Sequence, residues 1–137
     1  MSTKASQQVK QFDETNAAVG FAALEDVGNP IILNGRYSTI TFEVDNGDVA
    51  LGDFALLIQP HQAADFHVCI SASDWEDEQV VVKPWVSAAL QTLDASTKAA
   101  GRVEIGGCYA VKFQAKSSGA DTAVTVRGTI TSEETLL

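Results

Sequence analysis

Basic residues are scarce in this chain, and their scarcity argues against one class of partner. The 137 residues include 9 Lys and Arg against 18 Asp and Glu, which gives a formal net charge of −9 at pH 7. Nucleic-acid binding depends largely on cationic side chains that displace counterions from the phosphate backbone. The basic residues are also scattered without a cluster. We therefore expect no nucleic-acid partner, and the acidic balance favours solubility instead.

Long apolar runs are missing as well. No stretch approaches the roughly 18 consecutive apolar residues of a membrane span, so we expect no membrane partner. Residues 1–10 lack the apolar segment of a secretory signal peptide. This predicts synthesis in a cytoplasm, although a particle released by lysis needs no signal to leave the cell. The only two cysteines, Cys69 and Cys108, are then expected as free thiols, while a bridge between neighbouring strands stays open.

Catalytic and cofactor motifs are absent too. The chain contains no G-x-S-x-G elbow, P-loop, H-E-x-x-H or G-x-G-x-x-G fingerprint. We expect no catalytic residue, no enzyme activity, no cofactor and no metal site. A loose metal-type spacing is present at His61, Asp65 and His67. The acidic loop at 45–53 does not match the sequence pattern of a calcium-binding loop. We interpret it as a solvent-exposed turn.

Strand periodicity dominates what the chain does contain. Apolar and polar side chains alternate over residues 37–46, 109–116 and 122–131, as in strands with one buried and one wet face. Helix is considered only for residues 6–18 and 85–93, and the second stretch fits a strand equally well. Further strands are expected over residues 20–25, 54–59, 66–71, 79–83 and 102–105.

Turn signals separate these runs. They are Asn34-Gly35, Asn46-Gly47-Asp48, Gly106-Gly107 and Ser117–Ala120. The last lies between two alternating runs, so residues 108–131 are predicted to form a hairpin. Short strands at this spacing predict an all-β fold, an antiparallel β-sandwich or jelly roll of about 8 strands.

The N-terminal segment differs from the rest. Residues 1–15 are polar, with Val9 and Phe12 as their only sizeable apolar side chains. We expect an extended N-terminal arm over 1–15, which would fray alone in water, and a single β-sandwich domain over 16–137. Such an arm would contact a neighbouring subunit through Gln7, Val9 and Phe12.

Two tryptophans are the other candidate contact residues. Trp75 lies inside the acidic run 74–78, and Trp85 follows the strand expected over 79–83. Tryptophan is enriched at binding hot spots, so both are candidate partner-binding residues. Phe, Trp and Tyr together make up only 7% of the chain. Packing in the core would therefore explain the presence of both tryptophans equally well.

Two stretches carry a family resemblance. Residues 106–129, and residues 53–59 with Asp74-Trp75, resemble parts of small β-sandwich structural proteins of tailed bacteriophages. The resemblance implies a virion structural protein, most specifically a capsid decoration (cement) or head-tail assembly component, located in the virion. Its partners would be major capsid or tail proteins, in a homo-oligomer or symmetric array. No functional residue carries over, because such families have no catalytic site to match.

Two other functions stay open. A carbohydrate- or receptor-binding module of a tail or adhesin would present Trp75 or Trp85 to a glycan. A small jelly-roll enzyme would hold a metal ion at His61, Asp65 and His67. These alternatives rest on fold-level analogy.

Overall fold

The computed structural model describes residues 8–71, 85–86 and 93–132. Within these ranges the chain is all β, with ten strands and no helix. The strands are β1 (Val9–Val19), β2 (Glu25–Asp26), β3 (Ile31–Ile32), β4 (Thr39–Asn46), β5 (Leu51–Gln59), β6 (His67–Ser71), β7 (Trp85–Val86), β8 (Lys98–Glu104), β9 (Ala110–Ser117) and β10 (Thr122–Thr131).

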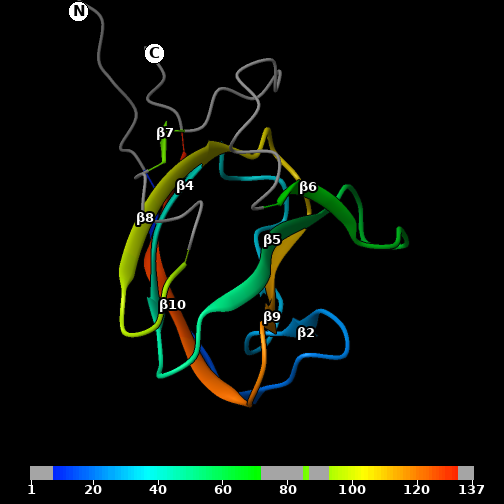
Figure 1. Ribbon diagram of the computed structural model, residues 1–137. Helices are drawn as coiled ribbons and strands as arrows, with labels where there is room; N and C mark the ends of the chain where they lie inside the picture. The colour runs from blue at the N-terminus through cyan, green and yellow to red at the C-terminus, as the bar shows by residue number, and fades with distance from the viewer. Residues whose placement is uncertain (1–7, 72–84, 87–92, 133–137) are drawn as a thin grey trace, which may run out of the picture.

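The strands form two antiparallel sheets that face each other (Figure 1). The first, which we call the β10 sheet, has the order β1-β10-β4-β8-β7. The second, the β9 sheet, has the order β2-β9-β5-β6, and β3 also pairs with β9. Each sheet buries one face against the other, as alternating side chains require. The predicted antiparallel β-sandwich is confirmed.

The core between the sheets is built around phenylalanine. Phe42 of the β10 sheet and Phe54 and Phe113 of the β9 sheet are almost completely buried. The ring centroid of Phe42 lies 5.2 Å from that of Phe113 and 6.1 Å from that of Phe54. Phe12, from the outermost strand β1, stacks on Phe113 at 5.7 Å. Aromatic rings in such offset or tilted pairs stabilise a core beyond the area they bury.

The hairpin predicted over residues 108–131 is wrong. Both strands form where expected, but β9 belongs to one sheet and β10 to the other. The connection at 118–121 crosses between the sheets, and the Ser117 hydroxyl supports it by donating to the Ala120 carbonyl at 2.5 Å. Alternation predicts which face of a strand is buried but not which strand pairs with it. Gly- and Ser-rich turns serve both kinds of connection.

A second crossing, from β4 to β5, is stabilised by one buried side chain. Asn46 is 3% exposed. Its Nδ2 donates toward the carbonyl oxygens of Val49 at 2.9 Å, Leu93 at 3.0 Å and Asp94 at 3.1 Å. One amide thus ties the β4–β5 connection to the segment that leads into β8. Its Oδ1 is buried without a hydrogen-bond partner among the described residues.

The helix considered for residues 6–18 is wrong over the residues of this stretch that the structure describes, 8–18. Residues 9–16 pair in regular register with β10 as part of β1, so they belong to the sheet. The inward positions of this strand are Lys10, Phe12, Glu14 and Asn16. With only one apolar residue among them, the hydrophobic alternation that marks a strand is absent.

The remaining strand predictions have mixed outcomes. Of residues 20–25, only Glu25 lies in a strand. Trp85 begins β7, which agrees with the strand interpretation of 85–93 at that end. Residues 1–7, 79–83 and 87–92 lie outside the described residues.

Candidate functional site

The outer edge of β1 is the candidate site. β1 ends the β10 sheet: it pairs with β10 on one side, and no strand among the described residues pairs with its other side. The strand spans 11 residues, which makes it a long edge. Natural proteins usually shorten, bend or cover such edges, because their free backbone groups recruit other chains.

The register identifies which backbone groups face outward. The Ser132 N–H donates to the Gln8 carbonyl at 3.0 Å, so Gln8 faces β10. In an antiparallel pair, hydrogen-bonded and non-bonded residues alternate. The even-numbered residues of β1 therefore direct their N–H and C=O groups to β10. The groups directed to the free edge belong to Val9, Gln11, Asp13 and Thr15.

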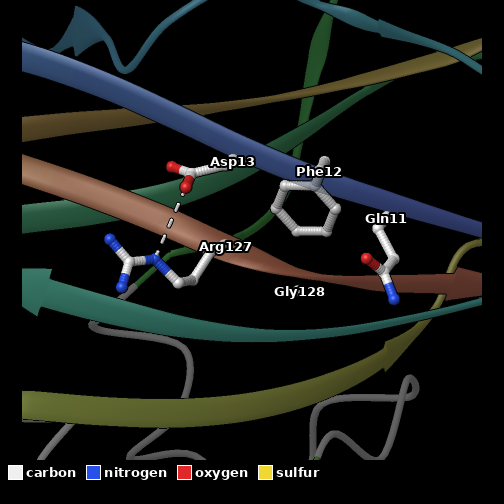
Figure 2. Close-up of a pocket in the computed structure, with 5 residues that line it drawn as sticks. All are labelled: Gln11, Phe12, Asp13, Arg127 and Gly128. Atoms are coloured by element: carbon white, nitrogen blue, oxygen red, sulfur yellow. Dashed lines mark ion pairs between the residues drawn. The ribbon is translucent and has the colours of Figure 1, made fainter.

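A shallow depression opens where β1 meets β10. Gln11, Phe12, Asp13, Arg127 and Gly128 line it. Figure 2 shows the Phe12 ring directed from β1 toward β10, beside Gly128. The exposed side chains of Gln11 and Asp13 leave the opposite face of the strand. The Arg127 Nε lies 3.8 Å from the Asp13 Oδ2. At this distance and exposure the ion pair adds little stability.

Gly128 allows the backbones of β10 and β4 to approach closely. It pairs with Phe12 on one side and with Phe42 on the other. A Cβ atom at Gly128 would overlap the Thr41 carbonyl oxygen and lie 2.8 Å from the Phe42 Cα. The backbones of β10 and β4 therefore approach too closely for any side chain at this position.

Charges of both signs lie along the same strand. Lys10 and Glu14 lie on the inward side, two residues before and two residues after Phe12. The Glu14 carboxylate also accepts a hydrogen bond from the Asn29 N–H at 3.3 Å. Val9, at the start of the strand, is 55% exposed. The edge thus combines exposed backbone groups, a half-buried ring and a symmetric pair of charges.

The structure brings together two of the five predicted contact residues. Val9 and Phe12 both lie on β1. The backbone of Trp85 is in β7, at the opposite edge of the same sheet. Gln7 and Trp75 lie outside the described residues. Sequence reasoning missed Gly128, whose signal was a lone glycine inside an alternating strand.

The metal-type spacing gains no support from the geometry. Among the described residues, no three His, Cys, Asp or Glu side chains are placed to hold a metal ion. His61 lies in a turn and His67 begins β6. In the described part of the chain, no helix is long and apolar enough to cross a membrane.

The cysteines do not form a disulfide with each other. Cys108 is a buried thiol, and its burial raises its pKa to about 11. Because the thiolate is the reactive form, Cys108 is a poor nucleophile at neutral pH.

Comparison with known proteins shows the fold. No family model matches the chain, and no curated protein matches its sequence. Among solved structures, the chain is similar to the SPBc2 prophage-derived protein YomS, with a TM-score of 0.57 and 14% sequence identity. The match covers 93% of this chain and 96% of YomS. At this identity the likeness shows a shared fold.

Proposed function

We propose that this chain is a structural protein of a tailed-phage virion, specifically a capsid decoration (cement) or related assembly component. The observation that carries the proposal is the fold shared with a prophage-derived protein over nearly the full length of both chains. The resemblance of residues 106–129 to small β-sandwich virion proteins supports it independently. On this proposal the chain acts through protein–protein contacts, without catalysis or a cofactor, and is located in the virion.

The β1 edge supports a role based on contacts. Outward N–H and C=O groups on an exposed strand allow another chain to add a strand to the sheet. Partners on this proposal are major capsid or tail proteins and further copies of this chain. In a symmetric array, many modest contacts gain avidity without one strong site.

The experiment that tests the proposal is a composition analysis of particles. Phage particles from the strain that encodes this chain are purified by density gradient, and heads and tails are separated. Peptides of the chain should be found by mass spectrometry in one fraction, at a molar ratio like that of other structural proteins. A chain that is expressed during lysis but missing from both fractions would refute the proposal.

A deletion of residues 1–15 is not a suitable test. Residues 9–15 pair with β10, so their removal would expose the core beside Phe12 as well as remove a contact surface. Point variants on the outward side of β1 separate these two effects.

The depression beside Phe12 favours one alternative, a carbohydrate- or receptor-binding module of a tail or adhesin. The depression offers an amide, a carboxylate and a guanidinium, which suit hydrogen bonds with the hydroxyl groups of a sugar. A glycan array would show a defined class of bound glycan, with binding lost in Arg127→Ala. An array without a hit would remove this alternative.

A further inference from the structure

We propose that the free edge of β1 pairs in antiparallel orientation with β1 of a second copy, about a two-fold axis at Phe12. The two β10 sheets would then form one continuous sheet. The inference deepens the proposed function by naming the partner of this edge, and it rests on that function for its role in assembly. Three features of the strand carry it.

The first feature is the parity of the outward backbone groups. These groups belong to the odd-numbered residues 9–15, so a second β1 can bond only when odd residues face odd residues. With the axis at Phe12, Gln11 faces Asp13 of the second copy, and Val9 faces Thr15. Both pairs exchange hydrogen bonds, and each occurs twice.

The second feature is the length of the regular edge. β1 begins at Val9, and its register with β10 shifts between Asn16 and Val19. A bulge of this kind bends a strand and ends regular pairing. Among the described residues, the odd positions available for pairing therefore run from Val9 to Thr15, and their midpoint is Phe12. An axis at Phe12 uses all of this described edge, while an axis at Gln11 or Asp13 leaves one end of it unpaired.

The third feature is the charge pattern. With the axis at Phe12, Lys10 of each copy faces Glu14 of the other, and opposite charges across a strand pair are favourable. An axis at Asp13 would place two aspartates face to face, and an axis at Gln11 would place Val9 opposite Asp13. The axis at Phe12 therefore gives the complementary arrangement.

Charges on an edge strand usually prevent pairing. Charges of one sign would repel a second copy in any register. Here opposite signs lie at equal distances from Phe12, which makes the strand complementary to itself. This self-complementarity is why we assign the edge to a second copy and not to an unrelated chain. The half-buried Phe12 rings would also meet across the axis, where side chains approach most closely.

The test is a charge exchange, followed by light scattering during size-exclusion chromatography over a range of concentrations. The full-length chain should reach a mass twice its 14.5 kDa. Lys10→Glu or Glu14→Lys alone would place two like-charged pairs in each dimer and should raise the dissociation constant about tenfold or more. The double variant K10E/E14K should have a dissociation constant within about threefold of that of the unsubstituted chain, since its oppositely charged pairs are restored. Arg36→Glu, the same charge change in an exposed turn, should leave the dimer intact.

A proline pair tests the backbone contact. Gln11→Pro removes an N–H that faces the free edge, so it should produce a folded monomer with an unchanged circular dichroism spectrum. Phe12→Pro removes an N–H that faces β10, and it should lower the thermal midpoint. A chain that is monomeric at all concentrations, or a dimer that K10E and Gln11→Pro leave unchanged, would overturn the inference.

The two proposals fail in different ways. A monomeric chain that is nevertheless found in particles would overturn only the β1 pairing. A β1-paired dimer that never enters particles would overturn only the virion role.

Discussion

Replacement of Asn46 by alanine tests how the crossing from β4 to β5 is stabilised. The Asn46 amide group has two hydrogens, and three carbonyl oxygens lie within 3.1 Å of its nitrogen. The Leu93 carbonyl would keep a second donor, because the Leu51 N–H donates to it at 3.0 Å. The carbonyls of Val49 and Asp94 would lose the Asn46 amide as donor, and Asp94 is exposed enough to recruit water.

The expected loss of stability is about 2 kcal/mol. Two hydrogen bonds contribute about 1 kcal/mol each, and a carbonyl left unsatisfied costs about 1 kcal/mol more. The substitution also removes the buried Asn46 Oδ1, which has no partner among the described residues. Loss of this unsatisfied acceptor stabilises the folded state by about 1 kcal/mol. For a domain of this size, a loss of about 2 kcal/mol lowers the thermal midpoint by about 6–10 °C.

Urea unfolding followed by circular dichroism is the assay. The midpoint should fall with an unchanged m value, because the surface exposed on unfolding stays the same. Asn29→Ala is the matched control, since Asn29 lies in an exposed loop, and it should change stability by less than about 0.5 kcal/mol. If Asn46→Ala were as stable as the control, the reasoning on this crossing would be refuted.

Three further predictions concern the core and the thiol. Gly128→Ala should cost about 3 kcal/mol or more in urea unfolding, because its Cβ would overlap the backbone of β4; a neutral effect would contradict the close approach. Phe12→Ala should cost about 2 kcal/mol through loss of the stack on Phe113, while Phe21→Ala, at 66% exposure, should cost under about 0.5 kcal/mol. Cys108, with its pKa raised to about 11 by burial, should react with a thiol reagent at pH 8 only after unfolding, and its contribution to stability should decline as the pH rises from the unfolded value toward 11. Rapid labelling of the folded protein at this residue would contradict its burial.

The strands with an apolar face were predictable from the sequence. Residues 39–46, 110–117 and 122–131 lie within or close to the predicted stretches, because a buried face needs an apolar residue at every second position. β1 lacks this signal, since Lys10 and Glu14 take inward positions at a sheet edge where water still reaches them. Its strand character comes from pairing with β10, and pairing is not encoded in local periodicity.

The candidate site was predictable only in part. Val9 and Phe12 were identified as contact residues because they are apolar residues in a polar segment. Their position on an edge strand of the sheet was not predictable, since an extended arm and an edge strand have the same composition here. Gly128 could be recognised as a break in alternation, but its role depends on the close approach of the β4 backbone at Thr41 and Phe42.

The sequence by itself determined the fold class, the acidic charge and the buried face of the main strands, because each depends on the identity and order of nearby residues. Only the tertiary structure decided that β9 and β10 belong to different sheets and that β1 ends one sheet with its odd-numbered backbone groups exposed. Sheet partners are chosen by packing between residues distant in sequence, and the same alternating strand fits either sheet until the core is assembled.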